Sequence, residues 1–238
     1  MQKLQDADME SITSEFLEQY DYYTVANKNE QFGFLLFEKG CLQMQENGNM
    51  QTALEYASIV LILHIQVQIA NQQMAEKYKA SFLEDLLTNN VKTDVEIHNR
   101  ARLYGWDFTN GGLAAVVDIN NIKKYFTDHL DSNTNRMLEE ATEIIFRHSI
   151  QEMHQMFPQS KYFRQSDLIV FIISMPENSR EGLPEQLEQT FRRLQSRLKM
   201  VSPFTITLGI GQYYENIRDI SKSYSEARVA INLGYSLQ

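Results

Sequence analysis

The stretch from residue 204 to residue 234 changes its hydrophobic period part-way along. Apolar side chains first take every second position, at Phe204, Ile206, Leu208 and Ile210, which is typical of a strand with one buried face. After a polar turn, apolar or small residues recur at helical spacing over 220–231. The pattern predicts a strand, a turn and a helix that folds back on the sheet to which the strand belongs.

The chain before this stretch alternates between strand and helix patterns. A fully apolar run over 113–117 ends at Asp118 and predicts a buried strand. The other predicted elements are a helix over 94–104 capped at Thr93 or Asp94, helical sequence over 119–156 with a break near 131–133, a strand pair at 162–163 and 168–174, and a helix over 183–200. The order βαββαβ with a final helix predicts an α+β fold, a ferredoxin-like antiparallel sheet with helices on one face.

The N-terminal part carries less apolar sequence. Residues 1–20 read as a polar helix, and strand patterns over 22–26 and 31–37 are joined by the turn-forming residues 27–30. Residues 40–49 read as a loop. A hairpin with one short helix buries little surface, so we expect this part to lean on the next element or on another chain.

That next element is a long helix from about Met50 to Asn89, without Pro or Gly. Its apolar residues fall on two roughly opposite faces: Leu54, Ala57, Leu61 and Ile65 on one, and Val60, Leu63, Val67, Ala70, Met74 and Tyr78 on the other. A helix that is apolar on two sides needs two packing partners. One hypothesis is that the hairpin covers one face and the same helix of a second subunit covers the other. The residues that we assign to the dimer helix, drawn from both faces, are Leu54, Leu61, Leu63, Ile65, Val67, Ala70 and Met74. The alternative is a helix buried within a single domain.

The helix ends in SFLEDLLTNN, where paired apolar residues meet an Asn89-Asn90 stop. We therefore predict three parts: residues 1–49 with the hairpin, residues 50–90 as a linker or dimerisation helix, and residues 91–238 as the sheet domain.

The composition of the chain argues against several classes of function. The formal net charge is −9 with a pI near 5.1. An acidic surface repels the phosphates of a nucleic acid, so we do not expect these residues to bind nucleic acid by themselves. The lone Cys41 excludes an internal disulfide and suits a reducing compartment. No signal-peptide pattern opens the chain, and the apolar run Ile59–Ile69 is short for a membrane span, which predicts a cytoplasmic protein without a membrane partner. The five histidines show no metal-ligand spacing, and we expect neither a metal nor a cofactor.

The segment LAAVVDINNIKKYFTD, residues 113–128, resembles the first strand and helix of nucleotide-cyclase-like GGDEF domains. The resemblance implies that Asp118 is the strand-end metal position and that Asn121 and Lys123 face the nucleotide. Aligned on Asp167, however, Gln165-Ser166 stands where that family has two glycines, and Leu168 stands where it has an acid. Close backbone approach and divalent-metal binding need those residues, so cyclase activity is not expected.

Further runs resemble PucR/CdaR-type bacterial transcriptional regulators. They are SFLEDLLTNNVKTDVEIHNRARLYGWDF, GLAAVVDI, SDLIVFII and ITLGIGQYYENIRDISKSYSEARVAINLG. The resemblance implies a degenerate GGDEF-like domain preceded by part of a GAF-like sensor domain, in a non-enzymatic homodimer that relays a signal to DNA through a C-terminal helix-turn-helix module. That module is not in this sequence. The alternative function is a catalytically dead cyclase-like domain that binds a nucleotide or another small-molecule effector through a residual site at Asp118.

Overall fold

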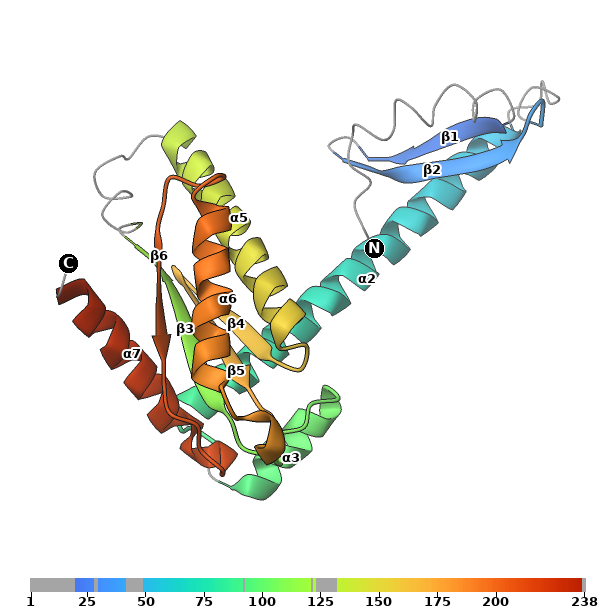
Figure 1. The fold of residues 1–238 in the computed structure, drawn as a ribbon. Helices are drawn as coiled ribbons and strands as arrows, with labels where there is room; N and C mark the ends of the chain where they lie inside the picture. Colours follow the sequence, from blue (N-terminus) through green and yellow to red (C-terminus); the bar gives the residue numbers. More distant parts are fainter. Residues whose placement is uncertain are drawn as a thin grey trace. The chain divides into compact units, whose positions relative to one another are not determined.

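The computed structural model describes residues 20–27, 30–41, 49–91, 93–120, 122 and 132–236. The chain divides into two compact units, Met1–Glu76 and Lys77–Gln238, which are described separately (Figure 1). The predicted N-terminal helix, most of the loop over 40–49, and the start of the helical sequence after residue 120 lie outside the described residues.

The first unit contains the predicted hairpin and most of the long helix. Strands β1 (Tyr20–Ala26) and β2 (Gln31–Glu38) pair antiparallel, with Tyr22 opposite Leu36. At the turn, the Asn27 side-chain carbonyl accepts a hydrogen bond from the Glu30 backbone N–H at 2.8 Å. The hairpin lies along the N-terminal half of helix α2 (Asn49–Leu87) (Figure 1).

The two apolar faces of α2 differ in exposure. On the first face, Leu54 is buried and Leu61 and Ile65 are half-buried. On the opposite face, Val60 and Leu63 are 65% and 56% exposed. The face that carries Leu54 is therefore partly covered within the first unit, although its Ala57 is exposed, and the opposite face is open.

Helix α2 is also long and apolar enough, by length and composition alone, to cross a membrane. Its most apolar 18-residue window has a mean hydropathy of 1.5, and 6% of that window is buried. The expectation of a chain without a membrane partner stays a prediction.

The second unit has the predicted βαββαβ order. Its elements are the end of α2, α3 (Asp94–Leu103), β3 (Leu113–Ile119), α5 (Ser132–Met156), β4 (Lys161–Gln165), β5 (Leu168–Ile173), a 3₁₀ turn η1 (Glu177–Ser179), α6 (Leu183–Leu198), β6 (Ile206–Ile210), a 3₁₀ turn η2 (Ile217–Asp219) and α7 (Ile220–Ser236). The strand order is β4-β5-β3-β6 and each neighbouring pair is antiparallel, as in the ferredoxin-like plan. The predicted cap of α3 is also confirmed, because the Thr93 hydroxyl accepts the Glu96 backbone N–H.

Helices cover both faces of this sheet, so the prediction of helices on one face is wrong. One buried apolar cluster joins the sheet to α5 and α6, and a second joins its other face to α3, α7 and the end of α2. The reason lies in the central strands. Five consecutive residues of β3 and all six of β5 are buried, and such strands need cover on both sides.

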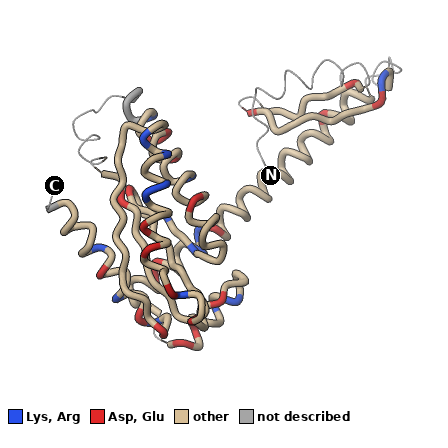
Figure 2. Tube along the Cα trace, viewed as in Figure 1, with Lys and Arg blue, Asp and Glu red and all other residues tan. Residues whose placement is uncertain are grey.

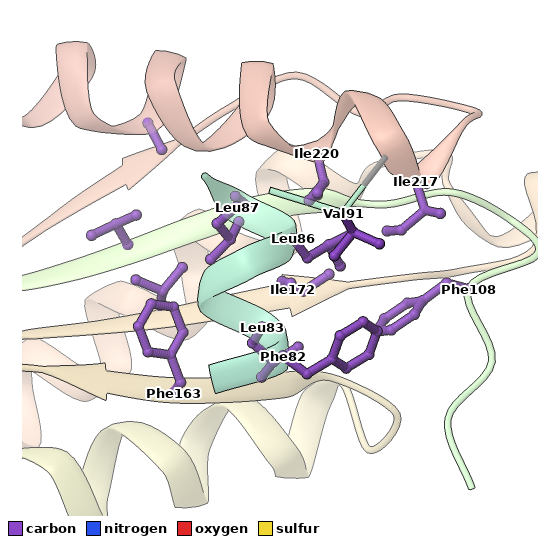
Figure 3. Packing of buried hydrophobic residues seen from close by; sticks show 14 of the residues in the cluster. Phe82, Leu83, Leu86, Leu87, Val91, Phe108, Phe163, Ile172, Ile217 and Ile220 are labelled. Atoms are coloured by element: carbon purple, nitrogen blue, oxygen red, sulfur yellow. The ribbon is translucent and has the colours of Figure 1, made fainter. Parts of the chain in front are cut away.

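The end of α2 supplies part of that cover. Phe82, Leu83, Leu86 and Leu87 are at most 3% exposed and point among residues of the sheet, α7 and the 3₁₀ turn before it (Figure 3). The compact unit therefore begins at Lys77, inside α2, whereas the sequence analysis set the boundary at residue 90. The paired apolar residues that mark the end of the helix belong to the sheet domain because the sheet buries them.

Candidate functional site

The sequence-predicted site lies at one end of the sheet, where three strands meet. Asp118 is near the end of β3, half-buried, opposite Leu168 of β5 and Thr207 of β6. Since Asp118 and Leu168 are direct cross-strand partners, the residue that replaces the expected acid lies next to the strand-end carboxylate.

The turn between β4 and β5 brings the second predicted carboxylate to the same end. Ser166 and Asp167 form this turn, because Gln165 pairs with Leu168 across it. The Asp167 backbone carbonyl accepts the Ile119 N–H at 3.1 Å, and its side chain is largely buried. Ser166 has φ of 55°, a left-handed conformation that glycine adopts at lower cost, so a glycine position is occupied by serine.

Leu168 is an apolar residue at the position where the cyclase-like pattern has an acid. It is 6% exposed and belongs to the apolar cluster shared with the end of α2 and with α7. Within the described ranges, no group of three or more His, Cys, Asp or Glu side chains is arranged to hold a metal ion. Asp118 and Asp167 are the two carboxylates left at the strand ends, and the third position expected to carry an acid holds the apolar Leu168.

Helix α7 adds a residue that the sequence analysis missed. The Tyr235 hydroxyl donates to the side-chain carbonyl of Asn120, just past the end of β3, at 2.7 Å. The same oxygen accepts the Thr207 hydroxyl at 2.8 Å, and the Asn120 amide donates to the Thr205 hydroxyl at 2.9 Å. Hydrogen bonds through Asn120 thus connect the end of α7 to the strand ends.

The surroundings of Tyr235 at the strand ends shift its pKa. Burial, and then the nearby charge of Asp118, raise the pKa of Tyr235 to about 12, and Asp167 contributes to the same shift. Both predicted carboxylates therefore raise the pKa of the same phenol. A signal for Tyr235 was present in the sequence, because it continues the sheet-facing stripe of α7 four residues beyond Ile231.

A hollow of about 450 Å³ lies beside the turn. It is lined by Ile122, Glu139, Thr142, Glu143, Phe146, Ser166 and Asp167. All its charged lining residues are acids, and Glu143 is paired with Arg164 at 2.6 Å. The predicted nucleotide-facing residues Asn121 and Lys123 lie outside the described residues. The described lining disfavours a phosphate chain, because like charges repel.

Along the rest of its length, α7 is held against the sheet by very close packing. A Cβ on Gly209 would lie 2.1 Å from the Ala227 carbonyl oxygen, and one on Gly211 would lie 1.9 Å from that of Ser223. The buried Ser223 hydroxyl accepts the Ala114 N–H of β3 at 2.8 Å. The Gly-Ile-Gly run and Ser223 therefore serve helix–sheet packing.

A comparison with protein-family models matches residues 88–233 to a family described as the GGDEF-like domain. The chain belongs to this family. The match runs from the end of α2 through most of α7, and so covers the antiparallel sheet and the helices on both of its faces. A comparison with curated proteins found no match.

The strand-end site of this GGDEF-like domain departs from the cyclase pattern that the sequence resemblance implied. Asp118 and Asp167 are in place, the acid position holds the buried Leu168, and a glycine position holds Ser166 in the left-handed conformation. The substitutions are compatible with the fold because Leu168 adds to the apolar core.

Proposed function

We propose that this chain is the regulatory, non-catalytic portion of a PucR/CdaR-like transcriptional regulator. In this proposal the N-terminal segment is part of a GAF-like sensor, α2 mediates dimerisation, and the GGDEF-like domain relays the signal to a C-terminal DNA-binding domain. The observation that carries the proposal is α2 itself, which begins in the hairpin unit and ends in the buried core of the GGDEF-like domain.

The absence of catalysis is supported by the strand-end site. Triphosphate chemistry needs carboxylates that hold divalent cations against the developing charge. The acid position is a leucine in the apolar core, and Tyr235 with Asn120 closes the strand ends. The buried leucine is the feature that weighs most against catalysis, because it supplies no ligand for a cation.

The relay has a physical route inside the GGDEF-like domain. Phe82, Leu83, Leu86 and Leu87 of α2 share one buried cluster with Ile220, Ala227 and Ile231 of α7 (Figure 3). Packed cores respond to displacement by switching between discrete arrangements. A ligand that shifts the pair of α2 helices would move these residues and with them α7, which leads toward the proposed DNA-binding domain.

The oligomeric state tests the first step. Sedimentation is expected to give a dimer, and Leu63→Glu on the open face is expected to dissociate it. Gln72→Glu is the matched control, since it adds the same charge to an exposed α2 residue away from that face and should leave the dimer intact. A monomer at high concentration, or a dimer indifferent to Leu63→Glu, would contradict the relay.

The reading frame beyond Gln238 tests the second step. It is expected to continue for ~80 residues, the size of a small module, with a basic helix-turn-helix pattern. A downstream sequence without such a pattern would remove the DNA-binding part of the proposal.

The second candidate function is nucleotide or small-molecule binding without turnover. The hollow beside Ser166 and Asp167 is the observation in favour of a small-molecule effector, whereas its acidic lining weighs against a nucleotide. Calorimetry with GTP and Mg²⁺ separates the two candidates. We expect neither heat of binding nor a thermal shift, and product analysis should recover GTP unchanged. Saturable heat without turnover would favour the second candidate.

A further inference from the structure

The open face of α2 has the spacing of a coiled-coil seam. Its apolar residues follow one another at alternating steps of four and three, which is the heptad pattern of a and d positions. They are Tyr56, Val60, Leu63, Val67, Ala70 and Met74. Tyr56, Leu63 and Ala70 take d positions, and the other three take a positions.

The rest of the helix surface agrees with this assignment. The buried or half-buried residues Leu54, Ser58, Leu61 and Ile65 fall at b and f positions, on the side away from the seam. The seam residues are exposed, Val67 and Met74 each by 54%. Every residue over 66–78 is exposed. A helix of this length without packing is marginal in water, so this segment needs a partner.

The charge pattern points to a second copy as that partner. No Asp, Glu, Lys or Arg lies between Glu55 and Glu76, and the middle of α2 is an unbroken tan run in Figure 2. A charged partner protein could form no ion pair with Asp, Glu, Lys or Arg on this stretch of α2. A second copy meets no like charge, and the e and g positions Gln66 and Asn71 carry amides that hydrogen-bond to each other across a helix pair.

We infer that residues 56–74 of two copies of this chain form a parallel, in-register, two-stranded coiled coil. The β-branched Val60 and Val67 at a positions and Leu63 at a d position favour parallel dimers. The inference rests on the proposed dimerisation and adds its orientation and register. A parallel pair also brings the two C-terminal ends of α2 together, which a symmetric output on two DNA half-sites requires.

Cysteine cross-linking of the full chain tests the register. The exposed Cys41 is first replaced by Ser, and Val60→Cys and Val67→Cys are then made separately on that background. In a parallel, in-register pair, each new thiol lies at the same level as its copy, close enough for a disulfide. Both variants are expected to give a cross-linked dimer under mild oxidation, and Gln72→Cys, at an f position, is expected to stay at background.

The outcomes separate the inference from the proposed function. A dimer by sedimentation in which Val60→Cys cross-links only when mixed with Ala70→Cys would indicate an antiparallel pair, which overturns the inference and leaves the dimer standing. A monomer would overturn both. A monomer that floats with phosphatidylcholine–phosphatidylglycerol vesicles would show that a bilayer covers this face, and would also overturn both.

Discussion

Replacing Gly211 by alanine should separate α7 from the sheet. The new Cβ would lie 1.9 Å from the carbonyl oxygen of Ser223 and 2.5 Å from its hydroxyl. Comfortable C···O contacts begin at about 3.3 Å, so α7 must retreat by roughly 1.4 Å. A shift of this size stretches the 2.8 Å hydrogen bond between the Ser223 hydroxyl and the Ala114 N–H beyond hydrogen-bonding range.

Two costs combine in this variant. Overpacking of a well-packed site costs about 1–3 kcal/mol. A buried backbone N–H left without its acceptor costs about 1–3 kcal/mol more. Loss of glycine's freedom in the unfolded chain offsets about 0.4–1 kcal/mol. The free energy of unfolding should therefore fall by about 1–5.5 kcal/mol, a large part of the roughly 5–15 kcal/mol typical of a domain.

Urea denaturation followed by tryptophan fluorescence measures this loss. Trp106 is the single tryptophan of the chain, and its ring stacks on Phe82 in the core of the GGDEF-like domain, so its emission reports unfolding of that domain. The midpoint should move to lower urea at an unchanged slope.

Gly234→Ala, within α7 itself, is the matched control. Its Cβ would meet nothing nearer than Thr207 Cγ2 at 3.8 Å, an ordinary contact. Helix propensity then favours alanine, and stability should rise by up to about 1 kcal/mol. If Gly211→Ala unfolds at the same urea concentration as the parent chain, the close approach of α7 to β6 is refuted.

Three other expectations concern the same domain. Ser223→Ala should lower the free energy of unfolding by about 1–3 kcal/mol, because the Ala114 N–H loses its acceptor, whereas the exposed Ser225→Ala should change it by under about 0.5 kcal/mol; equal effects would contradict the buried bond. Leu168→Glu should lower the free energy of unfolding by about 3–5 kcal/mol, because it leaves a buried charge unpaired. Leu168→Met should lower it by under about 1.5 kcal/mol. A Glu variant as stable as the parent chain would show that this site accepts an acid. The raised pKa of Tyr235 shows that the folded state favours the neutral phenol. The contribution of Tyr235 to stability is therefore complete below pH 10 and is lost as the pH rises toward about 12. Tyr235→Phe should lose less stability over this pH range than the parent chain, and identical plots of stability against pH for the two proteins would contradict this expectation.

The sequence predicted those parts of the fold that depend on local periodicity. The hairpin, the long helix, the order βαββαβ and the cap at Thr93 follow from periods of two and 3.6 residues and from turn chemistry, which neighbouring residues decide among themselves. The two apolar faces of α2 were predicted for the same reason, whereas the missing acid at Leu168 was inferred from the resemblance to cyclase-like GGDEF domains. That resemblance also singled out Asp118 and Asp167, and their role as a residual site stays a prediction.

Tertiary structure decided what depends on residues far apart in the chain. Tyr235 and Asn120 lie 115 residues apart, and only the return of α7 over the sheet makes their hydrogen bond. The cover on both faces of the sheet and the burial of Phe82 and Leu83 likewise come from elements that meet in space. The sequence determined which elements form and which of their faces are apolar, because those patterns are local. Which element covers each face is set by packing between distant segments, and that packing exists only in the folded chain.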